Sequence, residues 1–530
     1  MTLSDQDLLV ILGLLVAFTG LLAAAPRLHV PYPILLVVGG LLIGLVPGMP
    51  TIQVPPEFVL VGILPPLLYS AAFFTSLRDL RTYRRAIGLL SIGLVITTTV
   101  GVAIVAHALV GGLTWASAFV LGAIVSPTDP IAATSIARRL GIPHRIVAIA
   151  EGESLVNDGS SLVIYKFAVV AVLTGSVSAM SASLSFVWTV AGGVGIGLAI
   201  GWVIRQVRRR LDNPPVEITI ALMTGYFAFI PASLAGASGV LAVVAAGVYV
   251  GWHTPELTTV ETRLQGDAFW EILTFLLNGL LFVLVGLSLP AVLDALGGRL
   301  TTSLVWEAVA VFLAVVVLRF LWVFPATYVV RWAIPRIREH DPYPPWQHTV
   351  LLCWMGMRGA VSLAAALAIP IHTDAGLPFP GRDSILFLTF GVILGTLVVQ
   401  GLTLPGLVRV LRLEDDGAAE REEMKARIHA ANAALARIDE LIEEEWVRNE
   451  TAERLRGLYT FRRTRFKERY TGDGDGVIEE QSASYQQLLH KLLEAERQAV
   501  YDLRREGVIG DDAMRAVSRE LDLEEARLDL

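Results

Sequence analysis

The feature that most constrains this chain is a series of apolar runs, each about as long as a lipid bilayer is thick. A membrane-spanning helix needs about 20 mostly apolar residues, and thirteen stretches of residues 1–413 approach that length. With 54% hydrophobic residues and a mean hydropathy of +0.61, the chain is far more apolar than a soluble protein. The predicted spans are 8–25, 33–48, 57–74, 86–110, 115–137, 146–172, 184–204, 216–233, 237–252, 268–290, 303–330, 348–371 and 384–408.

The first run, 8–25, ends in small residues, as a secretory signal peptide also does. A signal peptide starts with basic residues, whereas Asp5 and Asp7 precede this run and no Lys or Arg does. We therefore interpret it as the first membrane helix.

The charges of the loops give the spans a direction. Lys and Arg near helix ends stay in the cytoplasm, and alternate loops hold 16 arginines on one side against two, Arg299 and Arg382, on the other. The sequence predicts a multi-pass protein of the cell membrane, with its N-terminus outside and its C-terminus in the cytoplasm. The 16 are Arg27, Arg78, Arg81, Arg84, Arg85, Arg138, Arg139, Arg145, Arg205, Arg208, Arg209, Arg210, Arg263, Arg331, Arg336 and Arg338.

The chain divides by charge into two predicted domains. Residues 1–413 carry a formal net charge of +3 and all the apolar runs, whereas residues 414–530 carry −10. The second part predicts an acidic cytosolic domain of three helices, at about 416–470, 482–508 and 511–528. Its TGDGDGVIEE stretch (471–480) is similar to a calcium loop, but Thr471 and Ser482 stand where such a loop needs carboxylates. We therefore expect a plain turn there.

Thirteen spans predict an all-α membrane domain built from two six-helix units, helices 1–6 and 8–13. The odd number of helices between the units gives them opposite orientations, as in inverted-repeat transporters. The fifth and twelfth helices then correspond, and both are interrupted: the fifth by Pro127 and Pro130, the twelfth by Gly356-Met357-Arg358-Gly359. Matched breaks of this kind point to a substrate site.

Ionisable residues on four spans are expected at one depth. At 1.5 Å per residue, Asp158 and Arg319 lie about 18 Å from the inner face, near the middle of a core roughly 30 Å thick. The same rise places Arg358 about 15 Å from the inner face and Asp129 about 21 Å from the outer face. Because charged groups inside a membrane are costly, they mark a functional site by default.

The sixth span carries the densest polar face of the membrane domain. Glu151, Ser154 and Asp158 follow one another at i, i+3 and i+7, and Glu153 and Asn157 at i and i+4. Removal from water disfavours the charged form of a carboxylate, so a proton and a cation can compete for Asp158. We expect this competition to drive exchange, with Asn157 orienting the site.

The break in the fifth span supplies further oxygen ligands. Thr128 and Asp129 add a hydroxyl and a carboxylate, and the neighbouring prolines free backbone carbonyls, which at this depth must line a cavity or find partners. Oxygen ligands suit hard monovalent cations, and the absence of a His or Cys cluster argues against a transition metal. We expect no cofactor, no nucleic-acid partner and no enzymatic activity.

Several of these residues also have a purely structural interpretation. Ser154 and Asn157 are residue types that hydrogen-bond between membrane helices. Glu153 can form a bridge to Arg319 or Arg358 that holds the helices together rather than serving transport. A purely structural role is hardest to argue for Asp158 and Asp129, which are expected at mid-depth.

Three motifs stand in the order, and at the separations, of a known family. SPTDPIAA (126–133), EGESLVNDGSSLVIY (151–165) and GMRGAVSLA (356–364) resemble the sodium/proton exchanger branch of the monovalent cation:proton antiporters. The resemblance covers residues 1–413. It implies a secondary transporter that exchanges a cation, Na⁺ first and K⁺ or Li⁺ next, for H⁺. It also implies a homodimer in membrane lipid with a moving ion-binding bundle.

The resemblance also implies roles for single residues. Asp158 corresponds to the carboxylate that binds cation or proton, with Thr128 and Ser154 near the Na⁺, and Glu153 to the family's bridge-forming glutamate. Members with an Asn-Asp pair, here Asn157-Asp158, are similar to electroneutral exchangers. One departure is Ser70 in LPPLLYSAAFF (64–74), at a position that is often acidic in the family.

Two other classes of protein place carboxylates at mid-membrane. A cation channel lines its pore with them, but passes current without obligatory proton counterflow. An intramembrane aspartyl hydrolase pairs two of them to activate water. The nearby arginines and the broken helices favour ion coupling over hydrolysis.

Overall fold

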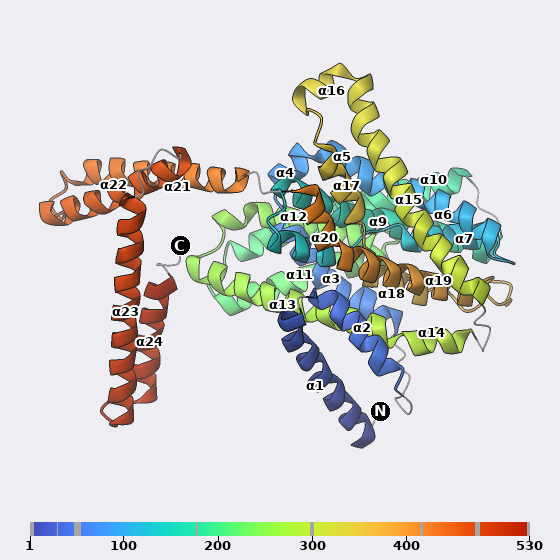
Figure 1. The fold of residues 1–530 in the computed structure, drawn as a ribbon, viewed down its shortest axis with the longest axis horizontal. Coiled ribbons are helices and arrows are strands. Elements are labelled where there is room, and N and C mark those ends of the chain that lie inside the picture. Colours follow the sequence, from blue (N-terminus) through green and yellow to red (C-terminus); the bar gives the residue numbers. More distant parts are fainter. Residues whose placement is uncertain are drawn as a thin grey trace. The chain divides into compact units, whose positions relative to one another are not determined.

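The computed structural model describes residues 5–28, 30–46, 55–175, 179–296, 302–413, 417–471 and 477–526. The regular segments of these ranges are helices, apart from an isolated β-bridge between His372 and Pro378. The chain forms two compact units, Met1–Asp415 and Asp416–Leu530 (Figure 1). Arg299 lies outside the described residues, as do residues 472–476 of the turn predicted over 471–480; within that stretch Thr471 ends one helix and Val477 begins the next.

Each of the thirteen predicted spans coincides with helix in the first unit. Eight helical stretches of the described residues are long and apolar enough to cross a membrane, and three shorter apolar helices accompany them. The count of thirteen crossings and the inverted repeats remain predictions. The longer helices are α1 (Asp5–Leu28), α2 (Tyr32–Gly44), α3 (Leu64–Phe74), α6 (Val95–Leu109), α9 (His144–Thr174), α10 (Ala179–Arg208), α11 (Pro214–Leu234), α12 (Gly239–His253), α13 (Val260–Leu287), α15 (Thr302–Ala333) and α19 (Arg382–Gly395).

Short helices and π-helical turns complete the first unit. The π-helical turns lead into α3 and α6 and join α19 to α20, so each of these spans is longer than its α-helical part. The short helices are α4 (Leu77–Thr82), α5 (Arg84–Gly88), α14 (Leu289–Ala295), α16 (Pro335–His340) and α20 (Gly401–Leu411), and the π-helical turns are Phe58–Ile63, Leu89–Leu94 and Thr396–Gln400.

Both predicted interruptions are present. The fifth span consists of α7 (Trp115–Val125) and α8 (Pro130–Arg139), and the twelfth of α17 (Trp346–Trp354) and α18 (Ala360–Leu367). Proline favours the first turn of a helix and the residue before it avoids the α conformation, so Pro130 starts α8 and forces the chain before it to unwind. Four residues separate α7 from α8, and five separate α17 from α18.

Helix α13 begins at Val260, well before the predicted start at 268. The Thr259 side chain accepts a hydrogen bond from the Thr262 amide and so caps the helix. The extra turns contain charged residues, which a hydropathy criterion excludes from a span. As a consequence, Asp267 and Glu271 lie within the helix rather than at its edge.

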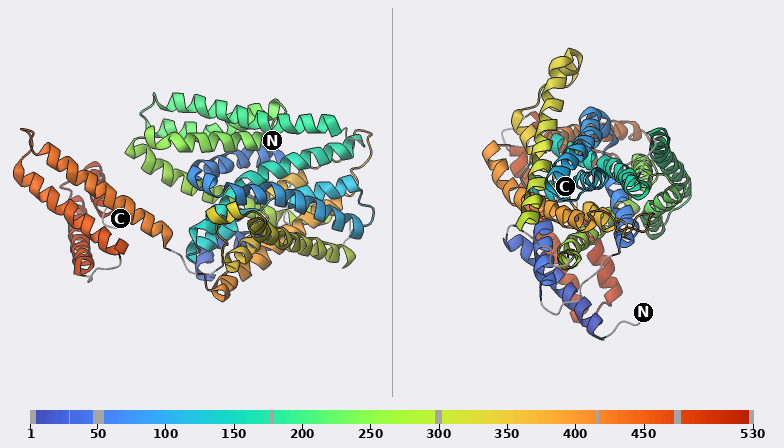
Figure 2. Two further views of the ribbon diagram at one scale, coloured as in Figure 1. Left: turned by 90° about the horizontal axis from the view of Figure 1, so that it is seen from above. Right: turned by 90° about the vertical axis from the view of Figure 1, so that its right-hand side faces the viewer.

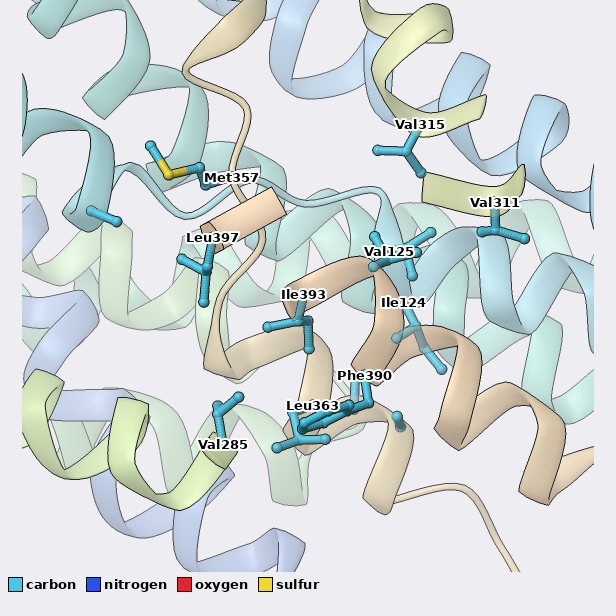
Figure 3. Packing of buried hydrophobic residues seen from close by; sticks show 14 of the residues in the cluster. Ile124, Val125, Val285, Val311, Val315, Met357, Leu363, Phe390, Ile393 and Leu397 are labelled. Carbon is cyan, nitrogen blue, oxygen red and sulfur yellow. The ribbon is translucent and has the colours of Figure 1, made fainter. Parts of the chain in front are cut away.

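Two clusters of buried apolar side chains stabilise the first unit. The larger cluster contains side chains of α2, α6, α7, α9, α15, α17, α18, α19 and α20. Figure 3 shows the part of it in which side chains of α7, α15 and α19 gather. The smaller joins α3, α11, α12 and α13 around Tyr69 and Trp270. Figure 2 shows several long helices of this unit, among them α10, α11 and α13, running roughly alongside one another.

A buried ion pair stabilises the helices around the smaller cluster. Arg208 of α10 lies 3.5 Å from Glu217 of α11, and both side chains are almost fully buried. Thr262 of α13 donates a hydrogen bond to the second oxygen of Glu217. Arg208 thus ends up in the protein interior, although its position in a basic loop predicts an exposed residue.

The described residues of the second unit form four helices, not the predicted three. The single helix predicted at 416–470 is wrong: the chain forms α21 (Ala418–Leu441) and α22 (Asn449–Thr471), followed by α23 (Val477–Arg505) and α24 (Asp511–Ala526). One long helix would leave its apolar side exposed, whereas folding back buries Met424, Ala431 and Ala452. Arg456 of α22 pairs with Asp439 of α21 across this hairpin.

Candidate functional site

The two unwound segments contact each other inside the first unit. The backbone N–H of Asp129, between α7 and α8, donates to the carbonyl oxygen of Met357, between α17 and α18, at 2.7 Å. The next amide, that of Arg358, donates to Thr396 Oγ1 at 3.1 Å. The backbone N–H groups of Asp129 and Arg358, which the breaks free from helical hydrogen bonds, therefore both find acceptors, as buried backbone groups must.

Two charged side chains compensate for the helix dipoles at the breaks. Asp129 caps α8, because its Oδ1 accepts the amide of Ile131 at 3.0 Å. Arg358 is fully buried and donates from Nε to the carbonyl of Val125, at the end of α7, and from Nη1 to the carbonyl of Gly356. An acid at a helix N-terminus and a base at a C-terminus both oppose the helix dipole.

Glu153 pairs with Arg319, one of the two arginines anticipated for it. The guanidinium of Arg319, on α15, donates two hydrogen bonds of 2.5 and 2.8 Å to the two oxygens of Glu153, and both side chains are only 1% exposed. Arg319 also donates from Nε and Nη2 to the carbonyl of Leu352, in the last turn of α17. One arginine thus joins α9, α15 and the first half of the broken twelfth span.

A chain of hydrogen bonds leads from this pair to Asn157, the residue before Asp158. The hydroxyl of Thr128 donates to Glu153 Oε1 at 3.0 Å, and the amide of Asn157 donates to Thr128 Oγ1 at 2.8 Å. Asn157 is 1% exposed, and its own Oδ1 has no hydrogen-bond partner in the described residues. The segment at Thr128 is therefore fixed against α9 directly beside Asp158.

Asp158 lies on the wall of a cavity of about 490 Å³ between α3, α9, α13, α18 and the break after α7. Ser154, Thr128 and Asp129 line the same cavity. Asp158 is 7% exposed, and none of the described residues donates a hydrogen bond to its carboxylate. Unlike Glu153, this carboxylate is available to a small cation or a proton.

Acidic residues that the sequence interpretation did not place at this site also line the cavity. Asp267 and Glu271 of α13 line it together with Glu151 of α9. On α13 they belong to a polar stripe with Thr274 and Asn278, at i, i+4, i+7 and i+11. That spacing is a signal in the sequence, which the late predicted start of the helix concealed.

Ser70 also lines the cavity, from α3. Its hydroxyl donates to the carbonyl of Leu67 at 2.9 Å, so it is occupied within its own helix. The position that is often acidic in the family therefore adds no charge to this cavity.

Two glycines of the broken twelfth span make room for charged side chains. A Cβ atom at Gly359 would lie 1.8 Å from Asp129 Oδ2, and one at Gly356 would lie 2.6 Å from Cδ of Arg319. Both contacts are far inside the van der Waals limit. The Gly-Met-Arg-Gly sequence thus lets the unwound backbone approach Asp129 and Arg319 closely.

Gly359→Ala is expected to displace the Asp129 carboxylate and to reduce exchange activity strongly. Gly356→Ala should instead lower thermal stability, because it disturbs the buried Arg319. Gly88→Ala is the matched control, since a Cβ there meets no atom within 4 Å. Cation-dependent proton flux and thermal melts of the three variants check these outcomes; normal flux in Gly359→Ala contradicts the first.

Most of the chain matches a known family. The family model described as "Sodium/hydrogen exchanger, transmembrane" matches residues 14–410. The chain belongs to the sodium/hydrogen exchanger family. The resemblance that the three motifs predicted is thereby confirmed, and the chain is a multi-pass membrane protein whose relatives are transporters.

Three named relatives of this exchanger come from bacteria. It is 36% identical over 98% of its length to an uncharacterized Na(+)/H(+) exchanger of Mycobacterium tuberculosis, 96% of which is covered. It is 34% identical over 71% of its length to the "Sodium, potassium, lithium and rubidium/H(+) antiporter" of Bacillus pumilus, 57% of which is covered. The Na(+)/H(+) antiporter ApNhaP of Aphanothece halophytica is 32% identical over 78% of this chain and 76% of its own length.

A solved structure has the same fold. The sodium proton antiporter MjNhaP1 of Methanocaldococcus jannaschii aligns with 76% of this exchanger and 99% of its own chain, with a TM-score of 0.57. The two sequences are 20% identical. This likeness supports the arrangement of the helices.

Proposed function

We propose that this exchanger moves a monovalent cation, Na⁺ in the first place, against H⁺ across the cell membrane, with Asp158 binding the two in turn. The observation that carries the proposal is the Asp158 carboxylate, which lines the cavity and receives no hydrogen bond from any described residue. Three other charged groups near the breaks are engaged: Glu153 with Arg319, Asp129 with the start of α8, and Arg358 with backbone carbonyls.

The chemistry rests on the cost of an unpaired charge in a medium of low dielectric constant. An ionised Asp158 without a partner is costly there. A proton or a cation removes that cost equally, so the binding bundle moves only when the carboxylate is neutralised. One charge in each direction makes the exchange electroneutral, as the resemblance of Asn157-Asp158 to the Asn-Asp members implies.

The ligands proposed for Na⁺ are oxygens of Asp158, Thr128 and Ser154. All three residues line the cavity, and oxygen ligands suit hard cations. The name of the Bacillus pumilus relative includes potassium, lithium and rubidium, so K⁺ and Li⁺ belong in the test. We further propose a homodimer in membrane lipid, with the N-terminus outside and the C-terminus in the cytoplasm.

Reconstituted vesicles with a clamped membrane potential test the proposal. An outward gradient of Na⁺ should drive proton uptake at zero potential, and the rate should not change when the potential is stepped. A cation channel would instead carry current in the absence of a proton gradient. Cation current without proton counterflow overturns the proposal, and flux with K⁺ or Li⁺ in place of Na⁺ ranks the ions.

Asp267 and Glu271 are expected to concentrate cations at the cytoplasmic end of the cavity. Asp267→Asn with Glu271→Gln should raise the KM for Na⁺ several-fold at low ionic strength and leave kcat nearly unchanged, because neither residue contacts the proposed site. Salt should abolish the difference, since charges further apart than about 8 Å are screened at 0.15 M. A salt-independent KM, or a fall in kcat, contradicts this role.

A further inference from the structure

Three arginines from three helical elements converge on one carboxylate, away from the cavity at Asp158. Arg331 of α15 donates from Nη2 to Asp341 Oδ2 at 2.5 Å, and Arg145 of α9 donates from Nη2 to Asp341 Oδ1 at 2.9 Å. Nη1 of Arg85, on α5, lies 3.7 Å from the same acid. A single negative charge therefore faces three positive charges.

The imbalance lies in a partly buried place. Arg331 is 4% exposed, and the side chains of Arg85 and Arg145 are 27% and 30% exposed. Removing charged groups from water costs free energy unless opposite charges compensate for it. Asp341 compensates for one of the three guanidinium groups, so two positive charges remain without an anion from the described part of the chain.

Arg85 is the least satisfied of the three. Its Nε and Nη1 are buried and have no hydrogen-bond partner in the described residues. Asp341 does not supply one, because its Oδ2 lies 3.7 Å from Arg85 Nη1, beyond hydrogen-bond distance. A buried donor without an acceptor is costly in a native structure, so a group that accepts hydrogen bonds from Arg85 would be bound favourably.

A cavity of about 60 Å³ adjoins these donors. Arg85, Arg145 and Arg331 line it with His348 and Thr349, and none of its lining residues is acidic. One water needs roughly 10–15 Å³ of such space, so the cavity admits a group of several heavy atoms. Its walls offer hydrogen-bond donors and positive charge, which suits an oxyanion.

We propose that this cavity binds a phosphate group. Guanidinium groups bind phosphate oxygens through paired hydrogen bonds, and α9 begins beside the cavity, so its N-terminus adds partial positive charge. The three arginines belong to the set that loop charges assign to the cytoplasmic side. The phosphate comes either from an anionic lipid of the inner leaflet, which such residues attract, or from solution.

The site also approaches the buried pair at the ion-binding bundle. The cavity extends inward to Ile149, Val323 and Leu352. Ile149 lies one helical turn from Glu153 on α9, Val323 lies one turn from Arg319 on α15, and the Leu352 carbonyl accepts from Arg319. A bound phosphate would therefore tie together the same three elements, α9, α15 and α17, that the Glu153–Arg319 pair joins.

The test uses the full-length protein in detergent, with thermal shift and native mass spectrometry as readouts. Phosphatidylglycerol, phosphatidylcholine and inorganic phosphate are added separately, with chloride at equal ionic strength as reference. We expect stabilisation by phosphatidylglycerol alone if the source is lipid, and by inorganic phosphate also if the source is soluble. Stabilisation by neither, beyond phosphatidylcholine and chloride, overturns the proposal.

Three variants test whether the phosphate group binds at this cavity. Arg85→Gln is expected to weaken the binding about tenfold, the effect of losing one charge-assisted hydrogen bond, whereas Arg84→Gln, at the exposed neighbouring residue, should bind as the wild type. Asp341→Asn should bind more tightly, because it removes the competing anion. If Arg85→Gln does not fold, the increase in affinity expected for Asp341→Asn still tests the site. Equal affinity in Asp341→Asn and the wild type contradicts the site.

Discussion

Asp158→Asn is expected to abolish cation-dependent proton movement while the protein remains folded. The amide keeps the size of the side chain but can neither carry a proton through the cycle nor neutralise a cation. A charge-assisted contact contributes up to about 3 kcal/mol, and each 1.36 kcal/mol corresponds to tenfold in rate or affinity. The flux should therefore fall on the order of 100-fold, to the background of empty vesicles.

Two comparisons make that result specific to Asp158. Asp267→Asn is the same substitution in the same cavity and should retain its maximal rate. Asp158→Glu keeps a carboxylate on the cavity wall and should recover part of the flux. Melting temperature and elution volume of each variant establish that it is folded. Na⁺-dependent flux that persists in Asp158→Asn removes this residue from the mechanism.

Glu153→Gln is expected to destabilise the membrane domain by about 3–5 kcal/mol, the usual effect of removing one partner of a buried ion pair. Arg319 would keep its charge in a site that is 1% exposed, and Thr128 would lose its charged acceptor. Arg319→Gln should destabilise by a similar amount. The double variant should be less destabilised than the sum of the two, because it leaves no uncompensated charge.

Thermal melts of the four proteins in one detergent measure this double-mutant cycle. Arg208→Gln breaks the other buried pair, with Glu217, and serves as the control for general loss of stability. It should lower the melting temperature and leave the dependence of flux on Na⁺ concentration unchanged, whereas Glu153→Gln should alter both. A Glu153→Gln protein that melts like the wild type refutes the structural role of this pair.

Much of the site is local in sequence and was therefore predictable. Asp158, Asn157 and Ser154 share one helix face at spacings that helix periodicity dictates, and prolines at 127 and 130 require a break after α7. The charge of the loops and the length of the apolar runs predicted the helices around them. The sequence does not decide which arginine Glu153 binds, because Arg319 and Arg358 both lie far from it along the chain and are expected at a similar depth.

What only the tertiary structure decided concerns groups that are distant in sequence. It brings Asp129 against Gly359, directs Arg358 to the end of α7, and places Asp267 and Glu271 on the cavity of Asp158. Likewise, the chain of the acidic tail turns back between α21 and α22, because burying apolar side chains stabilises it more than one uninterrupted helix would.

The sequence by itself determined that carboxylates lie within apolar spans, because hydropathy and helix periodicity are local properties. It determined the family through three motifs as well. The three-dimensional arrangement decided which charges compensate one another: among the described residues, nothing donates to the Asp158 carboxylate and nothing accepts from Nε and Nη1 of Arg85. Charge compensation depends on distances between helices, and these follow from packing rather than from the order of residues.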